Sequence, residues 1–252
     1  MSGHSKWANI KHRKGAEDAR RGKIFTKHAK LIAIAARNGA DVDTNSALRV
    51  AIDNARAENV PRDNIERAVK KGSGEGKGAA AMEEIFYEGF GPGGAAVYVE
   101  TLTDNRNRTL TNVKHVFTKN GGNFGSAGTV GYLFKKRGVI NVKVSEAGKS
   151  ADEIELAAID AGADDVITDG ETMTIYTEPT AVMKARAALE AAGIKVSSAS
   201  QTYVPQTSVK IEDVEVAKQL LKLIDLVEED EDVSEVFSNF DIAEDILEKL
   251  GD

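Results

Sequence analysis

The chain contains no cysteine, and this excludes disulfide bonds, thiolate metal ligands and a cysteine nucleophile. It also lacks any apolar run near the roughly 18 residues that a membrane-spanning helix needs, and its first residues lack the apolar core of a signal peptide. With 252 residues and 41% hydrophobic content, it is long and apolar enough for several buried cores. We therefore expect a globular, cytoplasmic protein that does not enter membranes.

The residue patterns of common enzymes and metal sites are also missing. The four histidines are too far apart in the sequence to share one helix face as metal ligands. No nucleophile elbow and no dinucleotide-binding glycine pattern is present. The glycine-rich stretch at residues 71–78 does not match a phosphate loop, which needs Gly in place of Lys71 and Ser or Thr in place of Gly78. We expect no enzymatic activity, cofactor, metal or small-molecule substrate.

Charge is distributed very unevenly along the chain. The formal net charge of −7 argues against a nucleic-acid partner for the protein as a whole. Residues 1–30, however, hold nine Lys and Arg against two acids, and residues 1–78 hold seventeen against nine, a net of +8. The remaining residues hold sixteen against thirty-one, a net of −15. This separation predicts a basic amino-terminal region that binds an anionic partner and an acidic remainder.

The most basic stretch lies at residues 6–14 and combines cations with an aromatic ring. Lys and Arg side chains would be attracted to phosphates, and Trp7 could stack on a base at roughly 1–3 kcal/mol. The alternative for Trp7, the only tryptophan, is that it anchors the segment on a protein core. The nucleic-acid contacts that we predict in this stretch are Lys6, Trp7, Lys11, His12, Arg13 and Lys14.

Three amphipathic helices are predicted after this stretch. Apolar residues recur at helical spacing from Lys23 to Asn38 and again from about Asn45, and a third helix begins at Pro61. The glycine-rich residues 71–78 are typical of a flexible linker. We therefore predict a basic helical domain over residues 1–78.

Strands and helices alternate beyond the linker. Residues 138–203 follow the order β-α-β-β-α-β of a ferredoxin-like unit, with helices at 151–161 and 179–192. Strands at 95–103, 129–135, 204–211 and 232–240, with helices at 105–120 and 213–227, would complete a second such unit around the first. The predicted fold class is α+β: a three-helix domain and two ferredoxin-like α/β domains, one inserted into the other. The predicted boundaries are 79–136 with 204–252 for the split domain, including a last helix at 242–250, and 137–203 for the inserted domain.

A second candidate site lies where the strand at 95–103 meets the following helix. Backbone amides and the positive end of the helix dipole suit a phosphate there, and Arg106 and Arg108 would add charge-assisted hydrogen bonds. The alternative is a capped helix start with exposed arginines. Residues 120–128 are interpreted as a mobile loop, and the acidic residues 228–232 as a solvated turn.

Several long motifs resemble the YebC/PmpR family. They are MSGHSKWANIKHRKG at residues 1–15, KIFTK at 23–27, TDNRNRT at 103–109 and GGNFG at 121–125. The resemblance spans essentially the whole chain and implies a helical domain plus two α/β domains. It also adds Lys23 and Lys27 to the predicted nucleic-acid contacts.

The family resemblance implies a regulator of gene expression but leaves its target open. Members are described as DNA-binding transcriptional regulators, whereas the similar mitochondrial protein is a translational activator, and bacterial relatives are linked to ribosomes stalled on proline runs. We expect a DNA-binding transcriptional regulator. The alternatives are an RNA- or ribosome-binding translation factor and a protein-interaction adaptor. No paired recognition helix for a palindromic operator is evident, so backbone and shape recognition is favoured.

Overall fold

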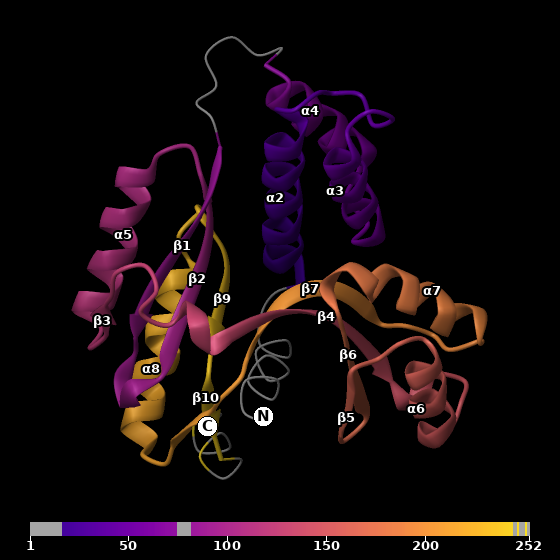
Figure 1. The fold of residues 1–252 in the computed structure, drawn as a ribbon. Coiled ribbons are helices and arrows are strands. Elements are labelled where there is room, and N and C mark those ends of the chain that lie inside the picture. The colour runs from indigo at the N-terminus through magenta and orange to yellow at the C-terminus, as the bar shows by residue number, and fades with distance from the viewer. Residues whose placement is uncertain (1–16, 75–81, 244–245, 247–249, 251–252) are drawn as a thin grey trace. The chain divides into compact units, whose positions relative to one another are not determined.

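The structure is a computed structural model that describes residues 17–74, 82–243, 246 and 250. Its Cα atoms form two compact units. One contains the chain up to Tyr132 and from Thr207 onward, and the other contains Leu133–Gln206, which we call the inserted unit. The fold class is α+β, as the sequence predicts, with an amino-terminal helical domain followed by two four-stranded antiparallel sheets and one parallel pair of strands (Figure 1).

The helical domain consists of α2 (Glu17–Ala36), α3 (Ser46–Ala57) and α4 (Arg62–Gly72). All three predicted helices are confirmed, although α2 already includes residues 17–22. Apolar residues at i, i+3 and i+4 spacing point inward and form one core. The fully or almost fully buried members of this core are Ile32, Ala36, Leu48, Ile52, Ala55, Val60, Ile65 and Ala68.

Two local features explain how these helices come together. Asn45 caps α3, because its Oδ1 accepts from the Leu48 N–H at 3.0 Å, and its Nδ2 donates to the carbonyls of Ala35 and Gly39 at 2.8 Å. Gly72 lies against α2 so closely that a Cβ there would be 2.2 Å from the Ala33 carbonyl oxygen. A larger residue at position 72 would push α4 away from α2.

The sheet of the first unit has the strand order β3-β1-β2-β9. Its helices α5 and α8 pack on one face of this sheet, over the core that includes Val97, Val99, Phe117 and Leu220 (Figure 1). The turn between β1 and β2 contains Pro92 and two glycines in the left-handed region, as a tight connection between antiparallel strands requires. The elements are β1 (Glu83–Phe90), β2 (Ala96–Thr103), α5 (Arg106–Lys119), β3 (Asn123–Phe124), β8 (Val209–Ile211), α8 (Val214–Glu228), β9 (Val233–Ser238) and β10 (Phe240–Ile242).

The inserted unit is a four-stranded antiparallel sheet of order β5-β6-β4-β7, with α6 and α7 on one face. Numbered along the unit, the strands lie in the order 2-3-1-4, which is the ferredoxin-like arrangement. Its core includes Ile140, Ile154, Ile175 and Leu189. The elements are β4 (Phe134–Lys143), α6 (Ala151–Asp160), β5 (Asp165–Asp169), β6 (Thr172–Thr177), α7 (Val182–Ala191) and β7 (Ser198–Pro205).

Two strand predictions near the junctions were wrong. Residues 129–133 are not a strand, because Val130 and Gly131 donate their N–H groups to the side chain of Glu88 rather than to a neighbouring strand. Residues 204 and 205 belong to β7, which pairs with β4 from Phe134↔Pro205 to Asn141↔Ser198. The predicted boundaries at 136/137 and 203/204 therefore fall inside one continuous ladder. In the first sheet, β1 lies between β2 and β3, and this strand is not among those predicted from the sequence. The predicted last helix at 242–250 lies mostly outside the described residues.

Candidate nucleic-acid interface

Each helix of the helical domain carries more basic than acidic residues. The Lys and Arg count against the Asp and Glu count is five to two in α2, two to one in α3 and four to two in α4. In α4 the apolar residues Ile65 and Ala68 are buried, whereas Arg67, Lys70 and Lys71 are exposed. The fold therefore places the cations of α4 on its outer side, where a phosphate backbone could reach them.

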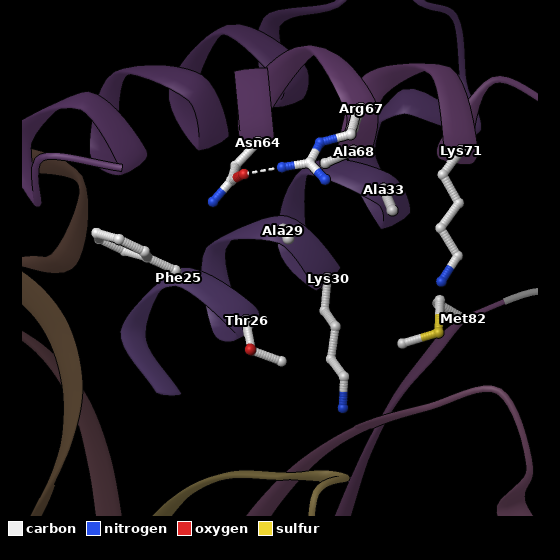
Figure 2. A pocket seen from close by; sticks show the side chains of 10 residues that line it. All are labelled: Phe25, Thr26, Ala29, Lys30, Ala33, Asn64, Arg67, Ala68, Lys71 and Met82. Atoms are coloured by element: carbon white, nitrogen blue, oxygen red, sulfur yellow. Dashed lines mark hydrogen bonds between the residues drawn. The ribbon is translucent and has the colours of Figure 1, made fainter. Parts of the chain in front are cut away.

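A groove of about 360 Å³ lies between α2 and α4 (Figure 2). In Figure 2 the side chains of Lys30 and Lys71 extend in the same direction, and Arg67 is hydrogen-bonded to Asn64. Ala29, Ala33 and Ala68 line the groove between these charged side chains, and their short side chains leave the charged groups accessible. The residues that line the groove are Phe25, Thr26, Ala29, Lys30, Ala33, Asn64, Arg67, Ala68, Lys71 and Met82.

The cations of α4 differ in how strongly they are held by the protein. Arg62 forms an i,i+4 ion pair with Glu66 at 2.7 Å, and Arg67 also donates to the Asp63 carbonyl at 3.2 Å. Lys70 and Lys71 have no acidic partner among the residues described. These two lysines need not break an internal ion pair to bind an anion.

The connection between α3 and α4 is four residues long. Asn59 adopts the left-handed conformation, with φ of 58°, and Val60 is buried and donates its N–H to the Ala55 carbonyl at 2.9 Å. A connection of three or four residues is one feature of a helix-turn-helix. The second helix of this pair is α4, whose exposed face is basic.

Lys27, which the family resemblance adds to the predicted nucleic-acid contacts, is only 27% exposed at its side chain. Its Nζ lies 2.6 Å from a carboxylate oxygen of Glu235 and 3.4 Å from one of Glu100, which are cross-strand neighbours on β9 and β2. Burial lowers the pKa of Lys27, but the two carboxylates outweigh this effect, and the net shift is upward. Burial raises the pKa of Glu100. The positive charge of Lys27 lowers this pKa, but by less than burial raises it, so the net shift is upward. Lys27 is therefore a charged link between α2 and the sheet.

Lys30, one helical turn further, contacts a second acidic group. Its Nζ donates to the Glu231 carbonyl at 2.6 Å and lies 3.6 Å from Oδ1 of Asp232. Asp232 is 6% exposed, and its Oδ2 also accepts from the hydroxyls of Thr103 and Thr109. The last residue of the acidic run 228–232 is therefore buried, with several hydrogen bonds to its Oδ2 atom, and is not solvated as predicted.

The second predicted site, at the start of α5, is a capped helix terminus. Asn105 accepts from the Arg108 N–H at 3.1 Å, and the Arg108 side chain donates to Asp232 at 2.7 Å and to Asp104 at 2.9 Å. Burial raises the pKa of Asp232, but hydrogen bonds from Arg108 and Thr109 and nearby positive charge lower it below its ordinary value. Arg108 is thus held by acids of its own chain. Arg106 is exposed, and its carbonyl accepts from the Tyr87 hydroxyl at 3.2 Å.

The loop after α5 is held in place by one buried carboxylate. Glu88, which is 6% exposed, accepts from the N–H groups of Gly128, Val130 and Gly131 at 2.8, 2.6 and 2.7 Å. These amides are therefore already used and are not available to a phosphate. The loop is tied to β1 at this point, in contrast to the mobile loop that we predicted.

The remaining predicted contacts lie where the structure gives no side-chain description. Lys6, Trp7, Lys11, His12, Arg13 and Lys14 precede the described residues, and Lys23 lies in α2 without a described side chain. Their nucleic-acid roles stay predictions. Sequence reasoning missed the acids that bind Lys27, Lys30 and Arg108. The one available signal was the charged Glu100 inside the otherwise apolar strand at 95–103.

Other site types find no support in the described part of the chain. Within it, no three His, Asp or Glu side chains are grouped closely enough to hold a metal ion. None of the helices described there has the length and apolar character needed to span a bilayer.

The fold and the site define an α+β protein that joins a basic helical domain to acidic, antiparallel sheet domains. Family models match almost all of it: the TACO1/YebC protein N-terminal domain matches residues 5–75, and the TACO1/YebC second and third domain matches residues 82–240. The chain therefore belongs to the TACO1/YebC family, which confirms the resemblance seen in its motifs.

Individual relatives are similar along their whole length. A protein from Halothermothrix orenii is 49% identical over 99% of both chains, and one from Trichlorobacter lovleyi is 51% identical over 99% of this chain and 100% of its own. Each is named "Probable transcriptional regulatory protein". The crystal structure of a conserved hypothetical protein, Aq1575, from Aquifex aeolicus is similar with a TM-score of 0.79 and 45% identity, over 91% of this chain and 94% of that one.

Proposed function

We propose that this protein is a non-enzymatic, nucleic-acid-binding regulator of gene expression. Its helical domain would bind the phosphate backbone. The observation that carries the proposal is the cationic outer side of α4 beside the α2–α4 groove, where Lys70 and Lys71 stand without an acidic partner in the described chain. Lys and Arg contacts to phosphates supply most of the affinity of such proteins. The basic residues 1–30 extend the same charge along the sequence.

Duplex DNA is the target that we propose first. The α3–α4 pair has the short turn of a helix-turn-helix, and the second helix of that motif is the one that enters the major groove. Arg62, Asn64 and Arg67 in the first turns of α4 would then face base edges or the flanking phosphates. The names of the relatives, "Probable transcriptional regulatory protein", support this choice.

A specific feature of the inserted unit favours RNA as the second candidate. A four-stranded sheet of this kind, with one face open to bases, is the architecture of a common RNA-binding module. The face opposite α6 and α7 carries a hydrogen-bonded row in which Thr174 donates to Asn141 at 3.2 Å and Asn141 donates to Ser198 at 3.0 Å. Tyr176 lies on the same face, two residues along β6 from Thr174. In this case the protein would act on structured RNA or the ribosome.

Affinity measurements across a salt series would decide between these targets. The full-length protein is titrated against a promoter-length duplex, a structured RNA and purified ribosomes, each from low to physiological salt. We expect the duplex to bind most tightly, with a log-log salt slope steeper than about −3, because several phosphates are contacted. A preference for RNA or ribosomes would reject the DNA assignment in favour of the second candidate. If none of the three binds better than a polyanion such as heparin, the whole proposal fails.

Charge-reversal variants test whether α4 is the surface used. Arg67→Glu with Lys71→Glu should weaken duplex binding and reduce the magnitude of the salt slope by about 2. The matched control is Lys210→Glu with Lys222→Glu, which makes the same change in net charge at two exposed positions of the same compact unit. An equal loss of affinity in both variants would mean that only net charge, and not the α4 surface, matters.

A further inference from the structure

Helix α5 concentrates positive charge in a part of the chain that is otherwise acidic. Between Met82 and Tyr132 there are four Lys and Arg residues and five Asp and Glu residues, and all four basic ones lie in α5 while none of the acidic ones does. Every other α-helix of the described chain contains at least one Asp or Glu. The separation of charge seen along the whole sequence is thus repeated inside this segment.

The cations of α5 are on its solvent side. Thr109, Val113 and Phe117 are buried against the sheet and α8. Lys114, His115 and Lys119 are exposed, as are the polar residues at 107, 111 and 118 that lie between them on the helix surface. The helix continues for 14 residues, or about 21 Å at 1.5 Å per residue. Thr111 and Thr118 donate their hydroxyls to the carbonyls of Asn107 and Lys114 in the same helix, so the cations are the groups that this long polar face offers to an anion.

The basic residues of α5 differ in whether an acid of the described chain holds them. Arg108, near the start, is bound by Asp104 and Asp232. Lys114 and Lys119 have no acidic partner in the described part of the chain. They are about 7.5 Å apart along the helix axis, whereas each strand of a duplex places one phosphate per 3.4 Å. Five residues also turn the helix by about 140°, so the two lysines flank the outer face of α5 and would meet phosphates on either side of it.

A need for solubility does not explain why α5 has an exposed basic face. The sheet part of this unit, residues 82–132 and 207–252 with α5 included, holds eight Lys and Arg against twenty Asp and Glu, so it already carries a large net charge. A basic residue in the last helical turn, such as Lys119, complements the helix dipole. Lys114, in the middle of the helix, has no such role.

We propose that the outer face of α5, centred on Lys114, His115 and Lys119, is a second phosphate-contacting surface for duplex DNA. This inference rests on the proposed function, since it assigns a further contact to the same ligand. The surface binds backbone phosphates without reading bases, because Lys ammonium groups are attracted to phosphate oxygens and carry no sequence information. The acidic residues around it repel DNA from the rest of the sheet domain and so confine the contact to the helix.

The test compares the variant Lys114→Glu with Lys119→Glu to the wild-type protein in duplex binding across a salt series. We expect the dissociation constant at physiological salt to rise roughly tenfold and the salt slope to lose about 2 in magnitude. The neutral variant Lys114→Gln with Lys119→Gln should produce a smaller loss in the same direction. Thermal unfolding of each variant checks that the fold is intact, as expected for exposed positions.

Each outcome of this test has a defined meaning. The control is again Lys210→Glu with Lys222→Glu, which changes the net charge equally and should leave the slope within about 0.5 of the wild type. Wild-type affinity and slope in the α5 variants, with loss in Arg67→Glu and Lys71→Glu, overturns the α5 surface and leaves the proposed function standing. Absence of duplex binding by the wild-type protein overturns both.

Discussion

The ammonium group of Lys27 on α2 lies 2.6 Å from the carboxylate of Glu235 on β9, 208 residues away in the sequence. Glu235 stands directly opposite Glu100 on β2, and like charges at such a cross-strand position destabilise a sheet. The single positive charge of Lys27 lies against both carboxylates and offsets part of their repulsion. A residue predicted as a nucleic-acid contact thus forms an ion pair within the protein.

Replacing Lys27 by methionine should destabilise the protein. The two carboxylates would remain partly buried without a counter-charge, and we expect a loss of about 1–3 kcal/mol in the free energy of unfolding. Urea unfolding at neutral pH measures this loss. Adding Glu100→Gln should restore part of it, because only one negative charge then remains. If the single variant is as stable as the wild type, the ion pair contributes nothing to folding.

Asp232 should make stability depend on acid pH in a defined direction. Its pKa in the folded state is below its ordinary value of 3.8, so its contribution is fully present above pH 3.8 and is lost as the pH falls through the lower, folded-state pKa. Asp232→Asn should cost about 1–3 kcal/mol at neutral pH and remove this part of the acid dependence. Unfolding free energies measured from pH 2 to 7 test the prediction.

Two observations would contradict this assignment of Asp232. The control variant Glu229→Gln removes an exposed charge from the same acidic run and should change stability by less than about 0.5 kcal/mol. A loss as large in this control would show that the run acts through its total charge. An unchanged acid dependence in Asp232→Asn would show that another group is responsible.

Glu88→Gln should loosen the loop that follows α5. An amide side chain has one oxygen in place of two and cannot accept all three N–H donors, so we expect a loss of about 1–2 kcal/mol. Hydrogen exchange at Gly128, Val130 and Gly131 should become faster, because their N–H groups would be released. Glu84→Gln, at an exposed position of the same strand, is the control and should leave exchange in the loop unchanged.

The basic amino-terminal segment should affect binding and not folding. We expect Lys11→Glu, Arg13→Glu and Lys14→Glu together to weaken nucleic-acid binding, with a nearly unchanged melting temperature, because phosphate contacts are lost. The control makes the same charge change at three exposed lysines, Lys184→Glu, Lys210→Glu and Lys222→Glu. A large drop in melting temperature for the first variant alone would show that the segment is part of the folded core.

Local patterns predicted much of the fold. The helices of the helical domain followed from apolar residues at helical spacing, and the order of elements in the inserted unit followed from alternating strand and helix patterns. The first sheet was harder, because residues 129–133 resemble a strand but donate their N–H groups to Glu88. In this sheet β1 lies between β2 and β3, and no local sequence pattern specifies that order of strands.

The candidate site was predicted in part. The sequence alone determined where basic residues are concentrated, that cysteine chemistry is absent, and that helices would carry the positive charge, since these depend only on composition and spacing. The tertiary structure alone decided which of those cations form ion pairs with acids of the same chain. Lys27, Lys30 and Arg108 meet acids more than 70 residues away, and such contacts depend on strand register and helix packing, which bring together residues that are remote along the chain.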